Sequence, residues 1–417
     1  MNGRKCEDHG EAEAEEDEFG FKNENNQARK SSIGYYMNLS KPSALFVPQA
    51  GEMTQPDVSH IDLTCEDPRV LRYDPAALQS SVTEIKEQAD AHNDYLTCPA
   101  PRARRPHDLL LLDDIFSLKE AQQEGSLNIL LLESSCAVQP TTRAWCALES
   151  LAQQNPEAVV WYVMRAGVLN TMVGPAASLL RQYSNLRPVT ADLRHLFSGT
   201  PLLRLYTTAA WNTNTTWPEV NLADLLRLAL VWHLGGMYVD TDVVCIRDVT
   251  RLVDVIGWQE TSTLGSGVFH LRRHHPFLQS VMQRVADGYQ TNKWGWSGPL
   301  AFTQVMLQLC GGAKGLVPGG GGAKGLVPGR AGRCQGIDLL PIIAFYPVPA
   351  SVWKTLFIPQ APRPVTQRYP RSYMIHTWNQ LSYRRPIVKD SGSIYDQAAR
   401  AFCPVTHAFA TAYNTVY

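Results

Sequence analysis

Asp240 and Asp242, two carboxylates two residues apart, are the side chains of this 417-residue chain whose types and spacing most clearly allow chemistry. They follow a short apolar run, 237–239, that is expected to be extended. Because side chains at i and i+2 of an extended chain lie on the same face, both carboxylates can face one ligand. Hard carboxylate oxygens suit Mg²⁺ or Mn²⁺, which usually keep substrate phosphates as further ligands. The pair therefore predicts a divalent cation held beside a diphosphate.

The segment before this pair distinguishes it from a solvated strand end, which is the common interpretation of an isolated Asp-x-Asp. Its apolar residues recur at helical spacing, and it ends in two glycines, of which Gly235 or Gly236 fits a left-handed C-cap. Asp224 and Arg227 are three residues apart and share one face of the predicted helix. They form either a surface ion pair, which contributes roughly a few tenths of a kcal/mol, or a polar edge turned toward the carboxylates.

The elements that must position these residues follow an α/β pattern. A strand, a helix and a second strand in succession form a β-α-β unit, which implies a parallel sheet with helices on its faces. In open sheets of this kind, ligands bind beyond the carboxyl ends of the strands, which is where the Asp pair lies. We predict strands at 128–132, 158–163, 186–193, 237–240 and 243–246, and a helix from Thr141 or Thr142 to Ala152.

Composition supports one large folded domain after an N-terminal segment of different character. The chain is 44% hydrophobic and 18% charged, and its net charge of −1 offers no electrostatic footprint for nucleic acid. Residues 1–107 are acidic, polar and interrupted by prolines, so we expect a largely disordered or stem-like segment. Residues 108–417 are expected to form the catalytic domain. No run of 18 apolar residues occurs, so no transmembrane helix is predicted.

The nine cysteines show neither Cys-x-x-Cys nor a Cys/His cluster with zinc spacing. Cys310 and Cys334 flank a glycine-rich insertion, 311–329, in which a nine-residue unit occurs twice. This arrangement suits a disulfide that closes the loop. Cys136 and Cys146 are a second candidate pair, although spacing does not fix connectivity. Cys245, inside an apolar run, is expected to be a buried thiol.

The central motifs resemble those of a known family. Asp224-x-x-Arg227, Gly-Gly-x-Tyr238 and Asp240-x-Asp242 resemble the signature of sugar-nucleotide-dependent glycosyltransferases with the GT-A fold. More narrowly, the chain is similar to the α1,4-glycosyltransferases related to lactosylceramide α1,4-galactosyltransferase. The resemblance implies a Rossmann-like, mostly parallel sheet with flanking helices. It covers 128–407 and includes, in the family's order, segments 146–150, 192–197, 295–299, 344–347, 376–379 and 403–407.

The resemblance also implies roles for single residues. Asp242 would bind the metal directly, Asp240 would contact the metal, the ribose or both, and His376 would complete the metal shell. The cofactor would be Mn²⁺ or Mg²⁺, and imidazole suits Mn²⁺ better. The remaining implied contacts are donor binding by Asp224, Arg227 and Tyr238, and acceptor binding by Trp296 and Ser297 in an aromatic turn at 294–299.

The implied activity is retaining transfer of galactose or an N-acetylhexosamine from a UDP-sugar to a terminal sugar of a glycolipid or glycan, in α1,4 linkage. The implied setting is glycosphingolipid synthesis at the Golgi membrane, with a lumenal catalytic domain and membrane association. Retention needs either a carboxylate nucleophile or a front-face path in which the leaving phosphate takes the acceptor proton. Because Asp240 and Asp242 are committed to the metal and Asp224 to the sugar, we favour the front-face path. Arg227 and the metal at Asp242 would stabilise the diphosphate.

Two other functions fit parts of the sequence. A catalytically inactive GT-A-fold protein would keep the fold and bind sugars without transfer. A phosphohydrolase of the haloacid dehalogenase type uses an Asp-x-Asp-x-Thr/Val motif, which 240–244 formally matches. That motif normally ends the first long strand of its domain, whereas here it lies more than halfway along the chain. Metal-dependent hydrolysis of a UDP-sugar distinguishes the three.

Overall fold

The computed structural model describes Cys98 and residues 109–310, 329–388 and 390–412, all of which lie in the unit Glu66–Tyr417. Apart from Cys98, the predicted stem at 1–107 lies outside the described residues. The repeat insertion at 311–329 does so too, except for Gly329. What was expected of these two segments stays a prediction.

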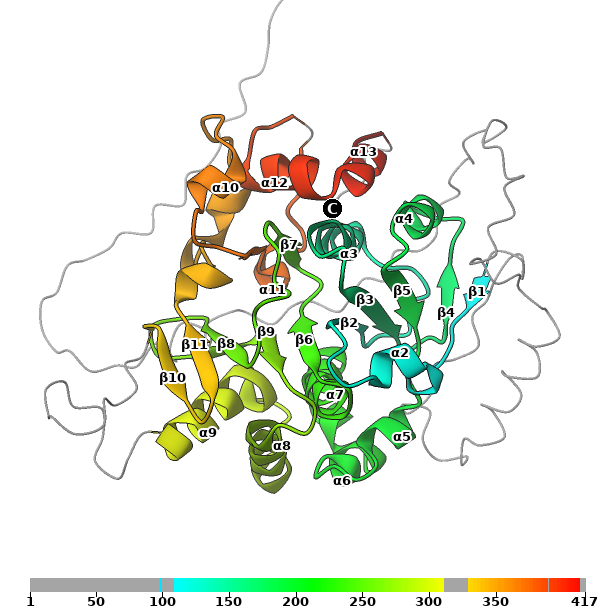
Figure 1. Ribbon diagram of the computed structural model, residues 1–417, viewed down its shortest axis with the longest axis vertical. Coiled ribbons are helices and arrows are strands. Elements are labelled where there is room, and N and C mark those ends of the chain that lie inside the picture. The colour runs from blue at the N-terminus through cyan, green and yellow to red at the C-terminus, as the bar shows by residue number, and fades with distance from the viewer. Residues whose placement is uncertain (1–97, 99–108, 311–328, 389, 413–417) are drawn as a thin grey trace, which may run out of the picture. The chain divides into compact units, whose positions relative to one another are not determined.

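The core element is an eight-stranded sheet with the strand order β10-β11-β8-β9-β6-β2-β3-β5 (Figure 1). Neighbouring strands are parallel in the β6-β2-β3-β5 part and in the β11–β8 pair, whereas β9 is antiparallel to both of its neighbours and β10 is antiparallel to β11. The strands are β2 (Asn128–Glu133), β3 (Val159–Met164), β5 (Leu186–Val189), β6 (Gly236–Val239), β8 (Val255–Trp258), β9 (Leu264–Leu271), β10 (Gly332–Cys334) and β11 (Ile337–Leu340).

Most predicted strands are found within a residue or two of their expected bounds, but the one predicted at 186–193 ends earlier, at Val189. Asp192 accepts the backbone N–H groups of Arg194 and His195, and thereby caps helix α5 (Leu193–Phe197). A side chain that satisfies the free N–H groups of a first helical turn favours the helix over continued strand.

Helices cover both faces of the sheet (Figure 1). Along β2 and β3 the buried side chains alternate between two hydrophobic clusters, as the two-residue period of a strand requires. One cluster includes α3 (Thr142–Gln154), α4 (Ala176–Gln182), α12 (Ile394–Phe402) and α13 (Pro404–Ala412). The other includes α5, α6 (Leu203–Thr207), α7 (Pro218–Leu234), α8 (Pro276–Gly288) and α9 (Ala301–Cys310).

Two small sheets and several short helices complete the described chain. β7 (Val243–Cys245) pairs antiparallel with β12 (Met374–His376), and β1 (Leu109–Leu111) with β4 (Val168–Asn170). Among the described helices, none is both long and apolar enough to span a bilayer. The short helices are η3 (Ile115–Ser117), α2 (Lys119–Gln122), η4 (Ala210–Asn212), η5 (Trp296–Leu300), η6 (Ile342–Ala344), η7 (Ala350–Phe357), α10 (Val365–Arg368) and α11 (Asn379–Ser382).

The helix before the Asp pair ends as predicted at the double glycine, but its cap differs from the prediction. Gly235 is the C-cap and has the expected positive φ, 67°, but its ψ of 174° lies outside the αL region, and the chain turns directly into β6. Gly236 also has a positive φ, and a Cβ there would collide with the carbonyl oxygen of Asn128 on β2. These two glycines therefore allow β6 to follow α7 at once and to approach β2 closely.

Three disulfides occur among the described residues, joining Cys98 to Cys136, Cys146 to Cys403 and Cys310 to Cys334. The predicted Cys310–Cys334 bond is confirmed, whereas the predicted Cys136–Cys146 pair is wrong. Cys146 lies on the face of α3 that packs on α13, where its partner is 257 residues away in sequence. Cys245 is a free, buried thiol as predicted.

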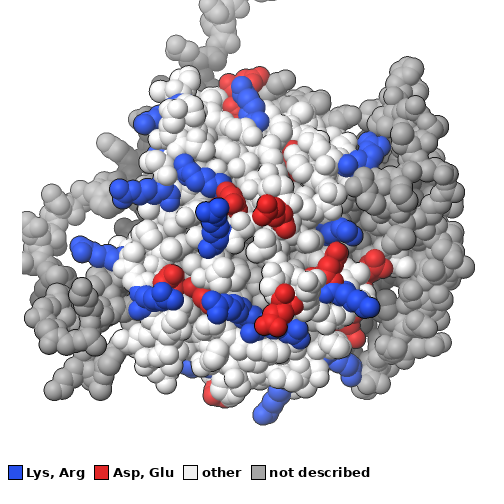
Figure 2. All heavy atoms as spheres, in the orientation of Figure 1, with Lys and Arg blue, Asp and Glu red and all other residues white. Residues whose placement is uncertain are grey.

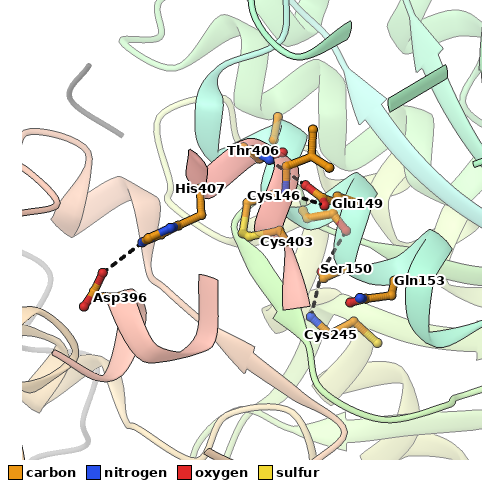
Figure 3. The surroundings of a disulfide bond; sticks show 12 residues. Cys146, Glu149, Ser150, Gln153, Cys245, Asp396, Cys403, Thr406 and His407 are labelled. Carbon is orange, nitrogen blue, oxygen red and sulfur yellow. Dashed lines mark hydrogen bonds and ion pairs between the residues drawn. A yellow bond between two sulfur atoms is a disulfide. The ribbon is translucent and has the colours of Figure 1, made fainter. Parts of the chain in front are cut away.

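The residues around the Cys146–Cys403 bond tie α13 to α3 (Figure 3). The buried carboxylate of Glu149 accepts the backbone N–H groups of Val405 (2.9 Å) and Thr406 (2.8 Å) in the first turn of α13. Such a carboxylate satisfies N–H groups that have no partner within the helix. His407 and Asp396 form a second buried contact, at 2.9 Å between Nε2 and Oδ1. The family-like segments 146–150 and 403–407 thus stabilise the fold.

Candidate active site

The two aspartates lie in the short connection between β6 and β7, and β12 brings His376 to them. In the β7–β12 pair, His376 lies opposite Val243, and Val243 is the residue that directly follows Asp242. Nε2 of His376 lies 3.3 Å from Oδ1 of Asp242 and 3.9 Å from Oδ2 of Asp240. One donor atom from each of these three residues lies within 4.8 Å of the others. Two carboxylate oxygens and an imidazole nitrogen form a donor set that fits a cation such as Mn²⁺.

Backbone groups orient two of these donors. The N–H of Asn379 donates to Oδ2 of Asp242 at 2.6 Å, which leaves Oδ1 directed toward His376. The N–H of Trp378 donates to Nδ1 of His376 at 3.1 Å. Because Nδ1 accepts a hydrogen bond here, the ring hydrogen lies on Nε2. A neutral imidazole binds a cation through Nε2 only with its hydrogen on Nδ1, so cation binding would require the other tautomer and the loss of the Trp378 hydrogen bond.

Asp224 and Arg227 form a buried network that reaches Asp240, which decides between the two interpretations of this pair. The guanidinium of Arg227 lies 3.1 Å from Oδ1 of Asp224 and 3.1 Å from Oδ1 of Asp240, and it donates to the carbonyl oxygen of Ser266 at 3.0 Å. It stacks over the ring of Tyr238 at 4.7 Å, and the Tyr238 hydroxyl donates to Oδ1 of Asp240 at 2.8 Å. The pair is therefore part of the carboxylate site and not a surface ion pair.

The network separates the acidities of its two carboxyl groups. Burial alone would raise the pKa of Asp240, but Arg227, with His376 and Tyr238, brings that pKa below its ordinary value. For Asp224, burial outweighs Arg227 and Ser297, so its pKa is raised. Burial would lower the pKa of Arg227, but Asp240 leads the groups that raise it. The guanidinium thus stays charged, and Asp240 is ionised, with Oδ1 held by Arg227 and Tyr238 and Oδ2 facing Nε2 of His376.

Trp296 and Ser297 lie in η5, where the predicted aromatic turn begins after the left-handed Gly295 and is kinked at Gly298, whose φ of −111° and ψ of −109° are not helical. The Ser297 hydroxyl donates to Oδ2 of Asp224 at 3.0 Å, so it lies against the predicted donor-binding carboxylate. Trp296 is 7% exposed, and Arg284 and Lys293 lie over its ring, at 4.8 and 4.6 Å from the ring centroid. Contact between this ring and an acceptor sugar requires those two side chains to move.

Three residues near the site had no role assigned from the sequence, namely Tyr346, Asn379 and Arg143. The Tyr346 ring packs 5.3 Å from that of His376, and Asn379 holds Asp242. Both lie in family-like segments, 344–347 and 376–379, which was the available signal. Arg143 on α3 donates to the Asn379 side chain at 3.0 Å, and nothing in the local sequence indicates this contact.

Acidic and basic side chains are interspersed over the face of the molecule shown in Figure 2.

Three features together define a GT-A glycosyltransferase. They are the mostly parallel sheet with helices on both faces, the Asp-x-Asp connection after β6 and the buried Asp-x-x-Arg network. Residues 141–263 match the family model described as glycosyltransferase sugar-binding region containing DXD motif. Residues 270–410 match the model described as alpha 1,4-glycosyltransferase conserved region. The chain belongs to this α1,4-glycosyltransferase family.

Individual relatives carry two kinds of name. Lactosylceramide 4-alpha-galactosyltransferase of Rattus norvegicus is 30% identical over 289 residues, which cover 69% of this chain and 76% of the rat protein. The Mus musculus protein of that name is 29% identical over 314 residues, covering 75% and 84%. Alpha-1,4-N-acetylglucosaminyltransferase of Homo sapiens is 27% identical over 294 residues, covering 69% and 82%. Family membership excludes the haloacid dehalogenase alternative.

Proposed function

We propose that the protein transfers a hexose from a UDP-sugar to a terminal sugar of a glycolipid or glycan, with retention and in α1,4 linkage. The observation that carries the proposal is the convergence of Asp240, Asp242 and His376 beside the buried Asp224–Arg227 pair. The names of the relatives support galactose or N-acetylglucosamine as the donor sugar and a glycolipid as one acceptor class. Glycosphingolipid synthesis in the Golgi lumen agrees with three disulfides, which persist in oxidising compartments.

Asp240, Asp242 and His376 would hold the Mn²⁺ or Mg²⁺ ion. A bound divalent cation supplies neutralisation of the charge that develops on a departing diphosphate. Arg227 keeps Oδ1 of Asp240 engaged, so that Oδ2 faces the cation position. A Cβ on Gly267 would lie 2.5 Å from that Oδ2, so the absence of a side chain at this position keeps the oxygen accessible.

The donor sugar would be bound by Asp224, whose two oxygens already have fixed partners in Arg227 and Ser297. A preorganised carboxylate suits the hydroxyl groups of a hexose, because it accepts hydrogen bonds without first reorganising. Gly298 lies next to Asp224, and a Cβ there would lie 3.1 Å from Oδ1. We infer that η5 closes one side of the donor-sugar pocket.

Retention would follow a front-face path. Each carboxylate of the site is held by other groups of the chain: Asp224 by Arg227 and Ser297, Asp240 by Arg227 and Tyr238, and Asp242 by Asn379. These contacts support the proposed roles of Asp240 and Asp242 at the cation and of Asp224 at the donor sugar, and with those roles none of the three is free to act as a nucleophile. The leaving phosphate itself would take the proton of the acceptor hydroxyl on the same face of the sugar, and Arg227 would stabilise the diphosphate.

The test is a screen of UDP-galactose, UDP-N-acetylgalactosamine and UDP-N-acetylglucosamine against lactosylceramide and soluble β-galactosides, with Mn²⁺ and with EDTA. The expected product has an α anomeric proton by NMR and a 1,4 linkage. A β-linked product would contradict retention. A trapped glycosyl-enzyme adduct would leave the transferase in place and remove the front-face path. Donor binding with neither hydrolysis nor transfer would identify an inactive sugar-binding protein.

A further inference from the structure

Helix α3 packs against β7 and also contacts the segment that follows β12. The hydroxyl of Ser150 accepts the backbone N–H of Cys245 on β7 at 3.0 Å (Figure 3). On the same helix, Cys146 and Glu149 hold α13. Arg143, near the start of the same helix, is 3% exposed and points to the segment that follows β12.

Arg143 is a buried cation, and among the described residues no carboxylate lies within ion-pair distance of it, 4.0 Å; Asp242 acts on its charge only from farther away. Its guanidinium instead donates to Oδ1 of Asn379 (3.0 Å), to the hydroxyl and carbonyl oxygen of Ser382 (2.5 and 2.8 Å) and to the carbonyl oxygen of Arg385 (3.2 Å). It also lies over the ring of Phe357 at 5.2 Å. Burial lowers its pKa. Burying a cation without a carboxylate partner is costly. These hydrogen bonds offset that cost, and they also fix the segment 379–385 against α3.

This segment in turn fixes Asp242. The N–H of Asn379 donates to Oδ2 of Asp242, and the N–H and hydroxyl of Thr377 both donate to the Asp242 carbonyl oxygen, at 2.8 and 2.9 Å. Trp378, between them, has a φ of 56°, which is uncommon for a bulky residue and costs about 1 kcal/mol or more. A turn in an unfavourable conformation keeps its geometry only where its surroundings hold it. Arg143 holds the residues that follow Trp378, through Asn379 and Ser382.

We propose that Arg143 is a positioning residue for the metal site, acting through Asn379. Its guanidinium holds the Asn379 side chain, so that the Asn379 N–H stays on Oδ2 of Asp242 and Oδ1 stays directed to the cation position beside His376. The inference rests on the proposed metal-dependent function. The positive charge of Arg143 by itself opposes the binding of a cation. Its benefit must therefore come from geometry, which a lysine of equal charge cannot reproduce because it lacks the planar fork.

The experiment measures Mn²⁺ binding to the purified full chain by isothermal titration calorimetry with UDP present, together with kcat, KM and the melting temperature. Arg143→Lys is expected to raise the Kd for Mn²⁺ about tenfold while kcat at saturating Mn²⁺ stays within about threefold of wild type. Glu149→Gln, on the same helix, is the matched control for a purely structural role. It should lower the melting temperature and leave the Kd unchanged.

Asn379→Ala removes the acceptor oxygen while leaving the other bonds of Arg143 intact, and it is expected to raise the Kd to a similar extent. The Kd of the double variant for Mn²⁺ should not exceed the higher of the two single-variant values. Both substitutions break the same bond, from the Arg143 guanidinium to the Asn379 side chain. A folded Arg143→Lys protein with wild-type Kd, or additive losses in the double variant, would overturn the proposal. If Arg143→Lys does not fold, unchanged Mn²⁺ affinity in Asn379→Ala overturns it alone. A wild-type protein that binds no Mn²⁺ contradicts the proposed function instead.

Discussion

Asp242→Asn is expected to abolish metal-dependent transfer while the fold is retained. In the structure, Oδ2 of Asp242 accepts the Asn379 N–H and Oδ1 faces His376. The amide oxygen of the variant can keep the bond to Asn379, which places the amide nitrogen at the position of Oδ1. That nitrogen carries two hydrogens and has no lone pair for a cation. The variant thus keeps the shape of the site but loses one ligand and one negative charge.

The size of the effect follows from Coulomb's law. A unit negative charge about 3 Å from a divalent ion contributes about 3 kcal/mol even at the dielectric constant of water, and more in a less polar site. A loss of about 3 kcal/mol is a rise of at least roughly hundredfold in the Kd for Mn²⁺. The free energy of unfolding should change little, because two effects oppose each other. The variant loses the repulsion between the charges of Asp242 and Asp240, and it also loses any attraction that the Asp242 charge had to its surroundings. We expect the melting temperature to stay within about 3 °C of wild type.

The assay is calorimetric titration with Mn²⁺ and transfer from the UDP-sugar that the screen identifies. Asp338→Asn on β11 is the control, since its side chain is 48% exposed and pairs with Arg333 away from the site. The control should match wild type in both measurements. Wild-type Kd and near-normal turnover in Asp242→Asn would refute the assignment of Asp242 as a metal ligand.

Three further predictions concern stability. Burial lowers the pKa of His270 to about 4. The neutral form is therefore favoured on folding, and the stability this histidine contributes is complete above about pH 6.5 and lost as the pH falls through about 4. The loss is up to about 3 kcal/mol, so chemical unfolding of His270→Asn should show a shallower dependence on pH over this range than wild type. Replacing Cys146 and Cys403 by serine should lower the free energy of unfolding by about 2–5 kcal/mol, because their bond closes a very long loop; unchanged denaturant midpoints would contradict this. Deleting one copy of the glycine-rich repeat should change donor KM and melting temperature very little, because loop closure varies by well under about 1 kcal/mol over ten residues; a large loss of donor affinity would place the repeat in the site.

The sequence by itself determined the local elements and the main donor pair. Period-2 and period-3.6 patterns located β2, β3, α3 and the end of α7 to within a few residues, because these patterns reflect which side of an element is buried. The two-residue spacing of Asp240 and Asp242 predicted a shared ligand, and the family-like motifs predicted that His376 would join them. Where a local rule failed, as at Asp192, a competing local interaction, a helix cap, was responsible.

Only the tertiary structure decided the contacts that give the site its chemistry. The pairing of β7 with β12 brings His376 to Asp242, and the packing of α7 under β6 turns Arg227 from a possible surface residue into the buried partner of Asp240. Asn379 reaches Asp242 across 137 residues, and Cys146 finds Cys403 across 257. Such contacts depend on strand order, register and the burial of distant helices against one sheet. None of these leaves a periodic signal in the local sequence, so they become visible only when the whole sheet is assembled.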